Sequence, residues 1–454
     1  MERLRTGSRE ADEILNGGFP TNSINIVMGQ PGTGKTIFVQ ALAWHNANGG
    51  RPVLYCTTLA EPLPKLVRYL QELDFFDPSQ VGTSVFYDDL GEAVGRQGLA
   101  GLNSSVREMI KEKRPAILII DSFKAAQELG GSDPDVRRMT FELAGLLSAY
   151  DVTTFLIGEY HERDIRESPV FAAADGIVEL MRVADDRRDE RYLRVLKLRG
   201  SDYRSGLHSF TITSGGLSIY PRLASRETPT GFGASQDRIP TGIPGLDALT
   251  GGGILERGQT LLLGSPGSGK TTMAMQFLLE GARRGEPCLF VGLQENPDQL
   301  EQLIRRLDPD LREAERANLE IRYQPPVEFQ IDSIVSDIFV GLRRRRLKRV
   351  VVDTIGELVV AASSRERLHD YVYSLLQAFS SNGATSLLTG SLELGRDAAA
   401  ASRVHHIADN IVIVEEYPSS PDRLRIRVRK CRFSSHERSS RFLELGKRGA
   451  RVVE

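Results

Sequence analysis

The sequence predicts two tandem α/β domains, each built on a mostly parallel sheet, and three observations lead to this fold class. The chain has 454 residues, which suits two hydrophobic cores better than one. Its two halves repeat the same landmarks at a nearly constant spacing. In each half, short apolar segments alternate with amphipathic ones, as they do where helices cover both faces of a parallel sheet.

The repeat also predicts the domain boundaries. Residues 3–18 read RLRTGSREADEILNGG and residues 238–253 read RIPTGIPGLDALTGGG, an offset of 235 residues (238 minus 3). Residues 222–237, RLASRETPTGFGASQD, are rich in Gly, Pro, Ser and Thr and lack a hydrophobic period, which indicates a linker. We therefore expect a first domain at 1–221, a linker at 222–237 and a second domain at 238–454.

Periodicity predicts the elements of the first half. Apolar stretches predict buried strands, amphipathic stretches predict helices, and an alternating pattern around the charged tip DDRRDE predicts an antiparallel hairpin near the end of the domain. The expected strands are 24–28, 53–58, 116–120 and 153–157, the helices 36–46 and 63–73, and the hairpin strands 176–183 and 191–199. The second half predicts a corresponding hairpin at 406–415 and 424–432.

Composition excludes several classes of protein. The formal net charge is −2, so the molecule has no overall basic field that would attract nucleic acid or an anionic membrane. Its three cysteines are scattered, which is typical of a reduced, cytoplasmic setting. No run of about 18 apolar residues is present, so we expect no transmembrane helix.

A glycine-rich loop follows the first predicted strand of each half and leads into a helix. The loops read GQPGTGKT and GSPGSGKT. Glycines let backbone N–H groups converge on phosphate oxygens, and the helix presents its positive end to them. A fortuitous glycine turn is the alternative, but two such loops in equivalent places favour a P-loop in each half. The predicted ATP-binding residues are Gly29, Gly32, Thr33, Gly34, Lys35 and Thr36 in the first half and Gly264, Gly267, Ser268, Gly269, Lys270 and Thr271 in the second.

Two further residue pairs predict a Mg²⁺ site in each half. The hydroxyls of Thr36 and Thr271 follow the P-loop lysines, where magnesium is held in P-loop NTPases. AILIIDS places Asp121, and RVVVDT places Asp353, at the end of a buried strand beside the loop, where an acid can hold the metal's ligand shell.

Hydrolysis needs a carboxylate near the attacking water and cations near the γ-phosphate. Glu61 in TTLAEPL and Glu295 in GLQENP follow the second strand of each half, so they are the candidate bases. The alternative is that each glutamate only begins a helix, where a carboxylate suits the dipole. Lys35 and Lys270 are the candidate catalytic cations.

Together these motifs resemble those of the KaiC family of tandem RecA-like ATPases, over nearly the whole chain. The resemblance implies RecA-like P-loop domains, ATP and Mg²⁺ as ligands, and a homohexameric ring with ATP between subunits. It also gives a role to the hairpin cations, which would reach the neighbouring subunit's nucleotide: Lys197 and Arg199 in KLRG, and Lys430 and Arg432 in KCRF. Solvated charges on an edge strand are the alternative.

The chain departs from the family in two places. Ala60-Glu61 and Gln294-Glu295 stand where the clock protein of the family has adjacent glutamates, which implies slow hydrolysis. His405-His406 stands where that protein has its phosphorylated Ser-Thr pair, so we expect no such phosphorylation there.

The leading hypothesis is a ring-forming ATPase that acts as a signalling switch or scaffold, with the first domain as the hydrolytic tier because its KLRG segment is more complete. A Ser/Thr autokinase and a RecA-like DNA-dependent ATPase remain as alternatives. Near-neutral charge argues against the DNA motor, since we expect no bulk attraction to nucleic acid.

Overall fold

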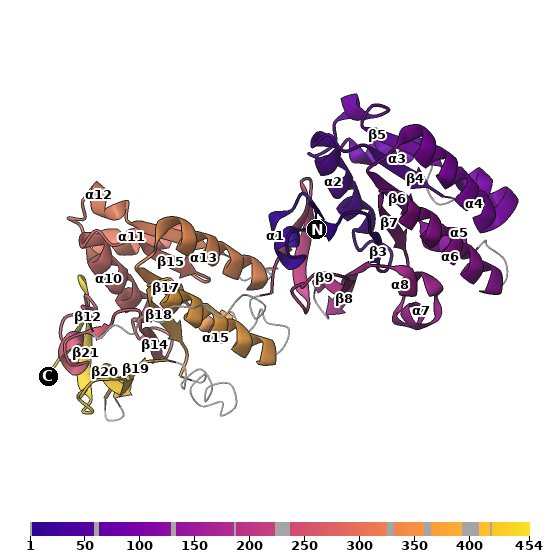
Figure 1. Ribbon diagram of the computed structural model, residues 1–454. Helices are drawn as coiled ribbons and strands as arrows, with labels where there is room; N and C mark the ends of the chain where they lie inside the picture. The colour runs from indigo at the N-terminus through magenta and orange to yellow at the C-terminus, as the bar shows by residue number, and fades with distance from the viewer. Residues whose placement is uncertain are drawn as a thin grey trace. The chain divides into compact units, whose positions relative to one another are not determined.

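The chain forms two compact units, Met1–Ser225 and Arg226–Glu454. The computed structural model describes residues 2–58, 63–128, 133–185, 188–222, 237–324, 331–357, 365–392, 408–417 and 420–454. Most of the expected linker therefore lies outside the described residues. Each unit is an α/β domain, as the sequence predicts, and each is described by itself (Figure 1).

The first domain is built on a nine-stranded sheet in the order β11-β10-β9-β8-β3-β7-β6-β4-β5. The six strands from β8 to β5 are parallel, and β9, β10 and β11 extend the sheet in antiparallel pairs. The strands are β3 (Ile24–Met28), β4 (Val53–Thr57), β5 (Val85–Asp89), β6 (Ile117–Asp121), β7 (Thr153–Gly158), β8 (Gly176–Asp185), β9 (Arg188–Leu198), β10 (His208–Thr213) and β11 (Gly216–Tyr220), preceded by the small pair β1 (Arg3–Leu4) and β2 (Phe19–Pro20).

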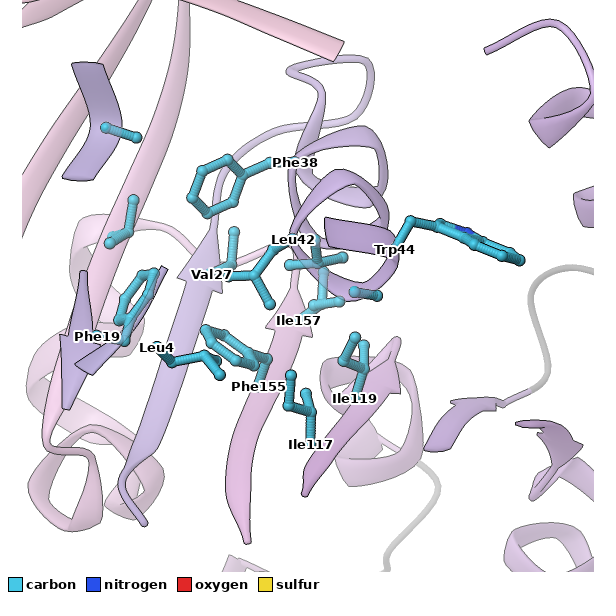
Figure 2. Packing of buried hydrophobic residues seen from close by; sticks show 14 of the residues in the cluster. Leu4, Phe19, Val27, Phe38, Leu42, Trp44, Ile117, Ile119, Phe155 and Ile157 are labelled. Carbon is cyan, nitrogen blue, oxygen red and sulfur yellow. The ribbon is translucent and has the colours of Figure 1, made fainter. Parts of the chain in front are cut away.

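Helices cover both faces of this sheet because successive strand residues point to opposite sides and both sides are apolar. One face packs against α1, α2 and α3, and the other against α4, α5, α6 and α8. Figure 2 shows the first of these cores, where Phe38 and Leu42 of α2 lie over Val27 and Ile157 of the central strands. The helices are α1 (Arg9–Ile14), α2 (Lys35–Asn48), α3 (Leu63–Leu70), α4 (Gly91–Lys113), α5 (Phe123–Glu128), α6 (Asp133–Ala149), α7 (Glu162–Glu167) and α8 (Pro169–Ala173).

The second domain repeats this topology with the order β16-β15-β17-β18-β14-β19-β20-β21-β22. Its strands are β12 (Arg238–Ile239), β13 (Ile254–Leu255), β14 (Gln259–Gly264), β15 (Cys288–Gly292), β16 (Leu319–Tyr323), β17 (Arg349–Asp353), β18 (Thr385–Gly390), β19 (Asn410–Tyr417), β20 (Ser420–Cys431), β21 (Arg441–Gly446) and β22 (Gly449–Val453). Its helices are α9 (Leu246–Leu249), α10 (Lys270–Arg283), α11 (Pro297–Leu307), α12 (Glu313–Arg316), α13 (Ile331–Arg345) and α15 (Arg365–Ser381).

The sequence-based fold class is confirmed, including the hairpin at the end of each parallel sheet. Two details differ from expectation. A second antiparallel pair follows each hairpin, β10–β11 and β21–β22. The strand expected at 406–415 begins at Asn410, because Asp409 instead holds the start of the neighbouring strand β14 through its carboxylate.

The opening repeat of each domain has a shared structural role. One carboxylate oxygen of Asp12 accepts hydrogen bonds from the backbone N–H and the hydroxyl of Thr6, both at 2.8 Å. Asp247 accepts the same two bonds from Thr241 at 2.9 and 2.6 Å. The repeated Thr and Asp therefore fix the turn that leads into the first helix. Among the described residues, no helix is long and apolar enough to cross a bilayer.

Two candidate ATP sites

Both glycine loops have the backbone that a phosphate cradle requires. Gly32 and Gly34 have φ of 72° and 94°, and Gly267 and Gly269 have φ of 78° and 83°, values that side chains disfavour. A Cβ on Gly29 would lie 2.0 Å from the carbonyl oxygen of Leu180, so only glycine lets the loop pass β8 this closely. Helices α2 and α10 begin directly after the loops and point their N-terminal N–H groups at them.

The P-loop lysines lie against their own loops. Lys35 Nζ donates to the carbonyls of Gly29 and Gln30, both at 2.9 Å, and Lys270 Nζ makes the same contacts with Gly264 at 3.0 Å and Ser265 at 2.8 Å. Burial lowers the pKa of both amines, while nearby carboxylates oppose the shift. Each ammonium is thus held at the mouth of the cradle, where phosphate oxygens would meet it.

In the first domain, the predicted metal residues are brought together. Thr36 Oγ1 donates to Asp121 Oδ2 at 2.9 Å, so the hydroxyl at the start of α2 and the acid at the end of β6 contact each other. The hydroxyl of Tyr55, on β4, donates to the same oxygen at 2.7 Å. Burial and the neighbouring Asp121 charge raise the pKa of Tyr55 well above its usual range, so this phenol stays protonated and remains a donor.

In the second domain, the acids are arranged differently. Thr271 Oγ1 donates to Glu295 Oε1 at 3.2 Å, and Asp353 Oδ1 accepts a hydrogen bond from the hydroxyl of Thr389 on β18. The remaining oxygens, Glu295 Oε2 and Asp353 Oδ2, are buried and have no hydrogen-bond partner in the described part of the chain. Burial, and then the charge of Asp353, raise the pKa of the Glu295 carboxyl.

Several predicted residues cannot be placed. Glu61, the candidate base of the first domain, lies outside the described residues, and so do Ala60 and the His405-His406 pair. Their roles stay predictions. Thr33 and Ser268 are buried within the loops, where Thr33 Oγ1 donates to the Gln30 carbonyl at 2.8 Å.

The predicted hairpin cations lie together at one corner of each sheet. Lys197 Nζ donates to the Phe171 carbonyl at 3.3 Å, and Arg199 forms an ion pair with Asp175 at 3.4 Å. In the second domain, Lys430 Nζ donates to the Ala408 carbonyl at 2.6 Å, and Arg432 pairs with Asp409 at 3.3 Å. Burial, and then the neighbouring arginine charge, lower the pKa of each lysine.

These cations lie at the end of the sheet opposite their own phosphate loop. Asp175 accepts a hydrogen bond from Ile24 N–H, at the start of β3, whereas the loop follows Met28 at its other end. A strand rises about 3.3 Å per residue, so the two ends of β3 are about 13 Å apart. Asp409 holds the start of β14 in the same way. The pairing register shifts by one residue just before Lys197 in β9 and just before Lys430 in β20. Such a bulge changes the direction in which the following side chains point.

Some residues of these sites were not predicted from the sequence. Tyr55, Thr389 and Glu159, which lies 4.0 Å from Lys35 Nζ, belong to segments far from the loops in sequence. Asp175 and Asp409 could have been found from the sequence, because each follows an alanine just before the first hairpin strand of its domain.

The residues present fit ATP and Mg²⁺. The cradle's positive-φ glycines leave room for backbone approach, and the two unpaired buried carboxylate oxygens of the second site suit a hard cation or its water ligands. Among the described residues, no cluster of three or more His, Cys, Asp or Glu side chains forms a protein-only metal cage.

Two α/β sheets, each with a glycine loop, an acid beside it and a helix that begins at the loop, have the architecture of P-loop NTPase domains in duplicate. The KaiC ATPase family model matches residues 4–224 and again residues 239–454. The chain therefore belongs to the KaiC family.

Curated relatives match over the full length of the chain. It is 26% identical to the circadian clock oscillator protein KaiC of Picosynechococcus sp., over 100% of this chain and 90% of the relative. It is 26% identical to the circadian clock oscillator protein KaiC 1 of Synechocystis sp., over 97% of this chain and 87% of the relative. KaiC of Rippkaea orientalis matches at 26% identity, over 100% of this chain and 89% of the relative.

Proposed function

We propose that this chain is a ring-forming ATPase that acts as a switch or scaffold, binding ATP with Mg²⁺ at each P-loop where two subunits meet. The observation that carries the proposal is the position of the hairpin cations. Lys197 and Arg199, like Lys430 and Arg432, lie one strand length from their own loop. They are too far from the γ-phosphate of their own loop, so a contact of this kind needs a phosphate bound outside their own domain, as a neighbouring subunit would supply.

Different residues of the chain would bind the phosphates and the metal ion at each site. The loop N–H groups and Lys35 or Lys270 bind the phosphates, while Thr36 with Asp121, or Thr271 with Asp353, hold the metal shell. When bound, Mg²⁺ would neutralise part of the negative charge of the phosphates. A neighbour's arginine would stabilise the charge that develops as the phosphoryl group is transferred, which makes turnover depend on assembly.

The nucleic-acid motor gains no support from the one dense basic run, residues 343–349. Arg349 is fully buried and paired with Glu286 at 2.5 Å, and Arg345 is paired with Glu320 at 3.2 Å. These contacts leave less free positive charge for a phosphate backbone.

The proposal predicts that removing both hairpin arginines uncouples binding from turnover. In a full-length Arg199→Ala/Arg432→Ala variant we expect each P-loop to bind ATP, but turnover to fall by roughly a hundredfold or more, as it does when an arginine acting in trans is lost. Phosphate release should also rise more steeply than linearly with wild-type protein concentration. Light scattering with and without ATP·Mg²⁺ would measure assembly in parallel.

Arg429→Ala is the matched control, because Arg429 is an exposed arginine on β20, just before the segment that carries Arg432. We expect it to assemble and turn over ATP as the wild type does. Turnover by a dilute monomer, or an Arg199/Arg432 variant as active as this control, would contradict a site shared between subunits.

A further inference from the structure

Phe433 is the most exposed large apolar side chain in the described part of the chain, with 87% of its surface accessible. It comes directly after Arg432, and Gly200 comes directly after Arg199 in the same turn of the first domain. In both domains the arginine donates its backbone N–H to the carbonyl of the aspartate just before the hairpin. A single exposed ring is common on protein surfaces, so exposure alone assigns no role to Phe433.

The backbone of Phe433 is what sets this residue apart. Its φ is 56°, and φ of Gly200 at the equivalent position is 67°. Glycine adopts this left-handed conformation freely, whereas the Cβ of a bulky residue is crowded there. The second domain thus has a strained aromatic residue where the first has the residue that suits the turn. Such strain persists where the surrounding structure imposes it, and it is concentrated at ligand-binding and other functional sites.

Hydrogen bonds on both sides of the ring impose this conformation. Arg238 Nη2 donates to the Phe433 carbonyl at 3.0 Å, and Ser434 Oγ donates to the Thr250 carbonyl at 2.9 Å. The facing turn makes room for this contact, because a Cβ on Gly251 would lie 2.5 Å from Ser434 Oγ. The main chain around Phe433 is therefore held within its own domain, while the ring projects into solvent.

The position of Phe433 places it beside a nucleotide if the proposed function holds. Arg432 would then contact a γ-phosphate bound by the second-domain loop of a neighbouring subunit, and consecutive Cα atoms are only about 3.8 Å apart. An uncharged ring does not neutralise phosphates, which the loop N–H groups and Lys270 would bind. Its flat π face suits a nucleotide base, on which aromatic side chains stack.

We propose that Phe433 is a base-contacting residue, whose ring packs against the purine of the ATP held by the neighbouring subunit's second-domain loop. The second site therefore discriminates between nucleotide bases, and the first site, with Gly200 in the equivalent turn, discriminates less. This deepens the proposed function and rests on it. Contact with the base would offset the backbone strain and the exposure of the ring.

Replacing Phe433 with the residue of the first domain tests the contact in the full-length protein. In Phe433→Gly we expect the second site to bind ATP·Mg²⁺ about tenfold more weakly, because stacking on a base is typically worth this much. The loss for CTP·Mg²⁺ should be smaller, since a pyrimidine offers less area to the ring. Calorimetric titration measures both affinities.

The same variant separates lost contact from misfolding. Glycine suits φ of 56°, so the urea midpoint of Phe433→Gly should not fall below that of wild type. Phe433→Tyr keeps the ring and should keep both the affinity and the preference for ATP. In a Lys270→Ala background, which lacks the second phosphate site, adding Phe433→Gly should leave the remaining binding unchanged.

A fluorescent side chain at this position reports the base directly. Trp44, the only tryptophan of the wild type, is buried in the first domain, so the indole of Phe433→Trp adds a separate, exposed signal. We expect ATP·Mg²⁺ to quench this added signal through stacking. Inorganic tripolyphosphate with Mg²⁺ has the phosphates without a base, so it should leave the signal unchanged.

Three results would overturn the assignment of Phe433. The first is a Phe433→Gly variant with wild-type affinities for both nucleotides. The second is an equal loss for ATP and CTP, which would place the ring against the neighbour's protein surface. The third is quenching by tripolyphosphate as strong as by ATP. In each case ATP binding by both loops would stand, whereas a wild type that bound no nucleotide would remove the proposed function and this contact with it.

Discussion

His208 at the start of β10 is a buried imidazole that joins two backbone segments. Its Nδ1 accepts a hydrogen bond from Arg222 N–H at 2.9 Å, so the proton of the neutral ring is on Nε2, which lies 3.0 Å from the Arg204 carbonyl. Burial lowers the pKa of His208, and the charges of Arg204 and Arg222 add to this effect. The neutral ring therefore stabilises the end of the first domain.

This arrangement predicts a pH-dependent stability for the first domain. Because the folded pKa lies below the unfolded value of about 6.5, the contribution is present above that value and is lost as pH falls through the folded pKa. Trp44, the only tryptophan, is buried in this domain, so its fluorescence reports unfolding of this half. We expect wild type to lose more stability than His208→Gln between pH 7 and pH 5. Equal slopes in the two proteins would contradict the assignment.

At the scale of single residues, the sequence predicted the site residues that belong to a recognisable motif. Thr36 and Asp121 were predicted as residues of one metal site because both follow fixed landmarks of P-loop proteins, and the structure places them in contact. Tyr55 could not be found in this way, since nothing in VLYCT shows that its ring reaches the acid of the neighbouring strand. That contact depends on the pairing of β4 with β6, which one sequence does not specify.

Arg349 links several elements of the second domain. Its guanidinium pairs with Glu286 at 2.5 Å, and Nη1 donates to the carbonyls of Pro240 at 2.8 Å and Phe277 at 3.0 Å. It also lies 4.7 Å from the centroid of the Phe277 ring. The first residue of β17 thus holds α10 and the segment after β12.

Loss of this side chain should weaken the second domain selectively. We expect Arg349→Ala to lower its free energy of unfolding by about 3 kcal/mol, because two carbonyls and the partly exposed Glu286 carboxylate lose a fully buried partner. Circular dichroism during guanidinium titration would show that the second domain unfolds at a lower concentration. The unfolding transition of the first domain, followed by Trp44 fluorescence, should not shift. Arg346→Ala, an exposed arginine of the same basic run, is the control and should not move either transition. A shift as large in the control would refute this role.

At the scale of elements, the sequence predicted the apolar strands and the first hairpin of each domain, but not the second antiparallel pair that follows it. Residues 24–28 form β3 as expected, since a short apolar run before a glycine loop has few alternatives. The pair β10–β11 was missed although TITSGG contains a turn signal, because its strands are only partly apolar. The pair packs against the P-loop through Ile212 and Leu217, near Gly34, and that contact is long-range.

Over the whole molecule, duplication preserved the fold and let the two sites diverge. Both sheets share one strand order, yet the acid beside the loop receives its extra hydroxyl from β4 in the first domain and from β18 in the second. The repeat predicted two ATP sites but not the different hydroxyl donors of their acids, because these donors come from strands that are distant from the loops in sequence. A shared fold therefore does not imply identical contacts at the two sites.

Calorimetric titration with ATP·Mg²⁺ tests the central claim most directly, since the proposed function requires both loops to bind nucleotide. Wild type should bind two equivalents per chain. Lys35→Ala and Lys270→Ala should each lose one, and the double variant should lose both, because each lysine serves its own loop. A wild-type chain that binds no adenine nucleotide, or lysine variants that bind as wild type does, would contradict this account.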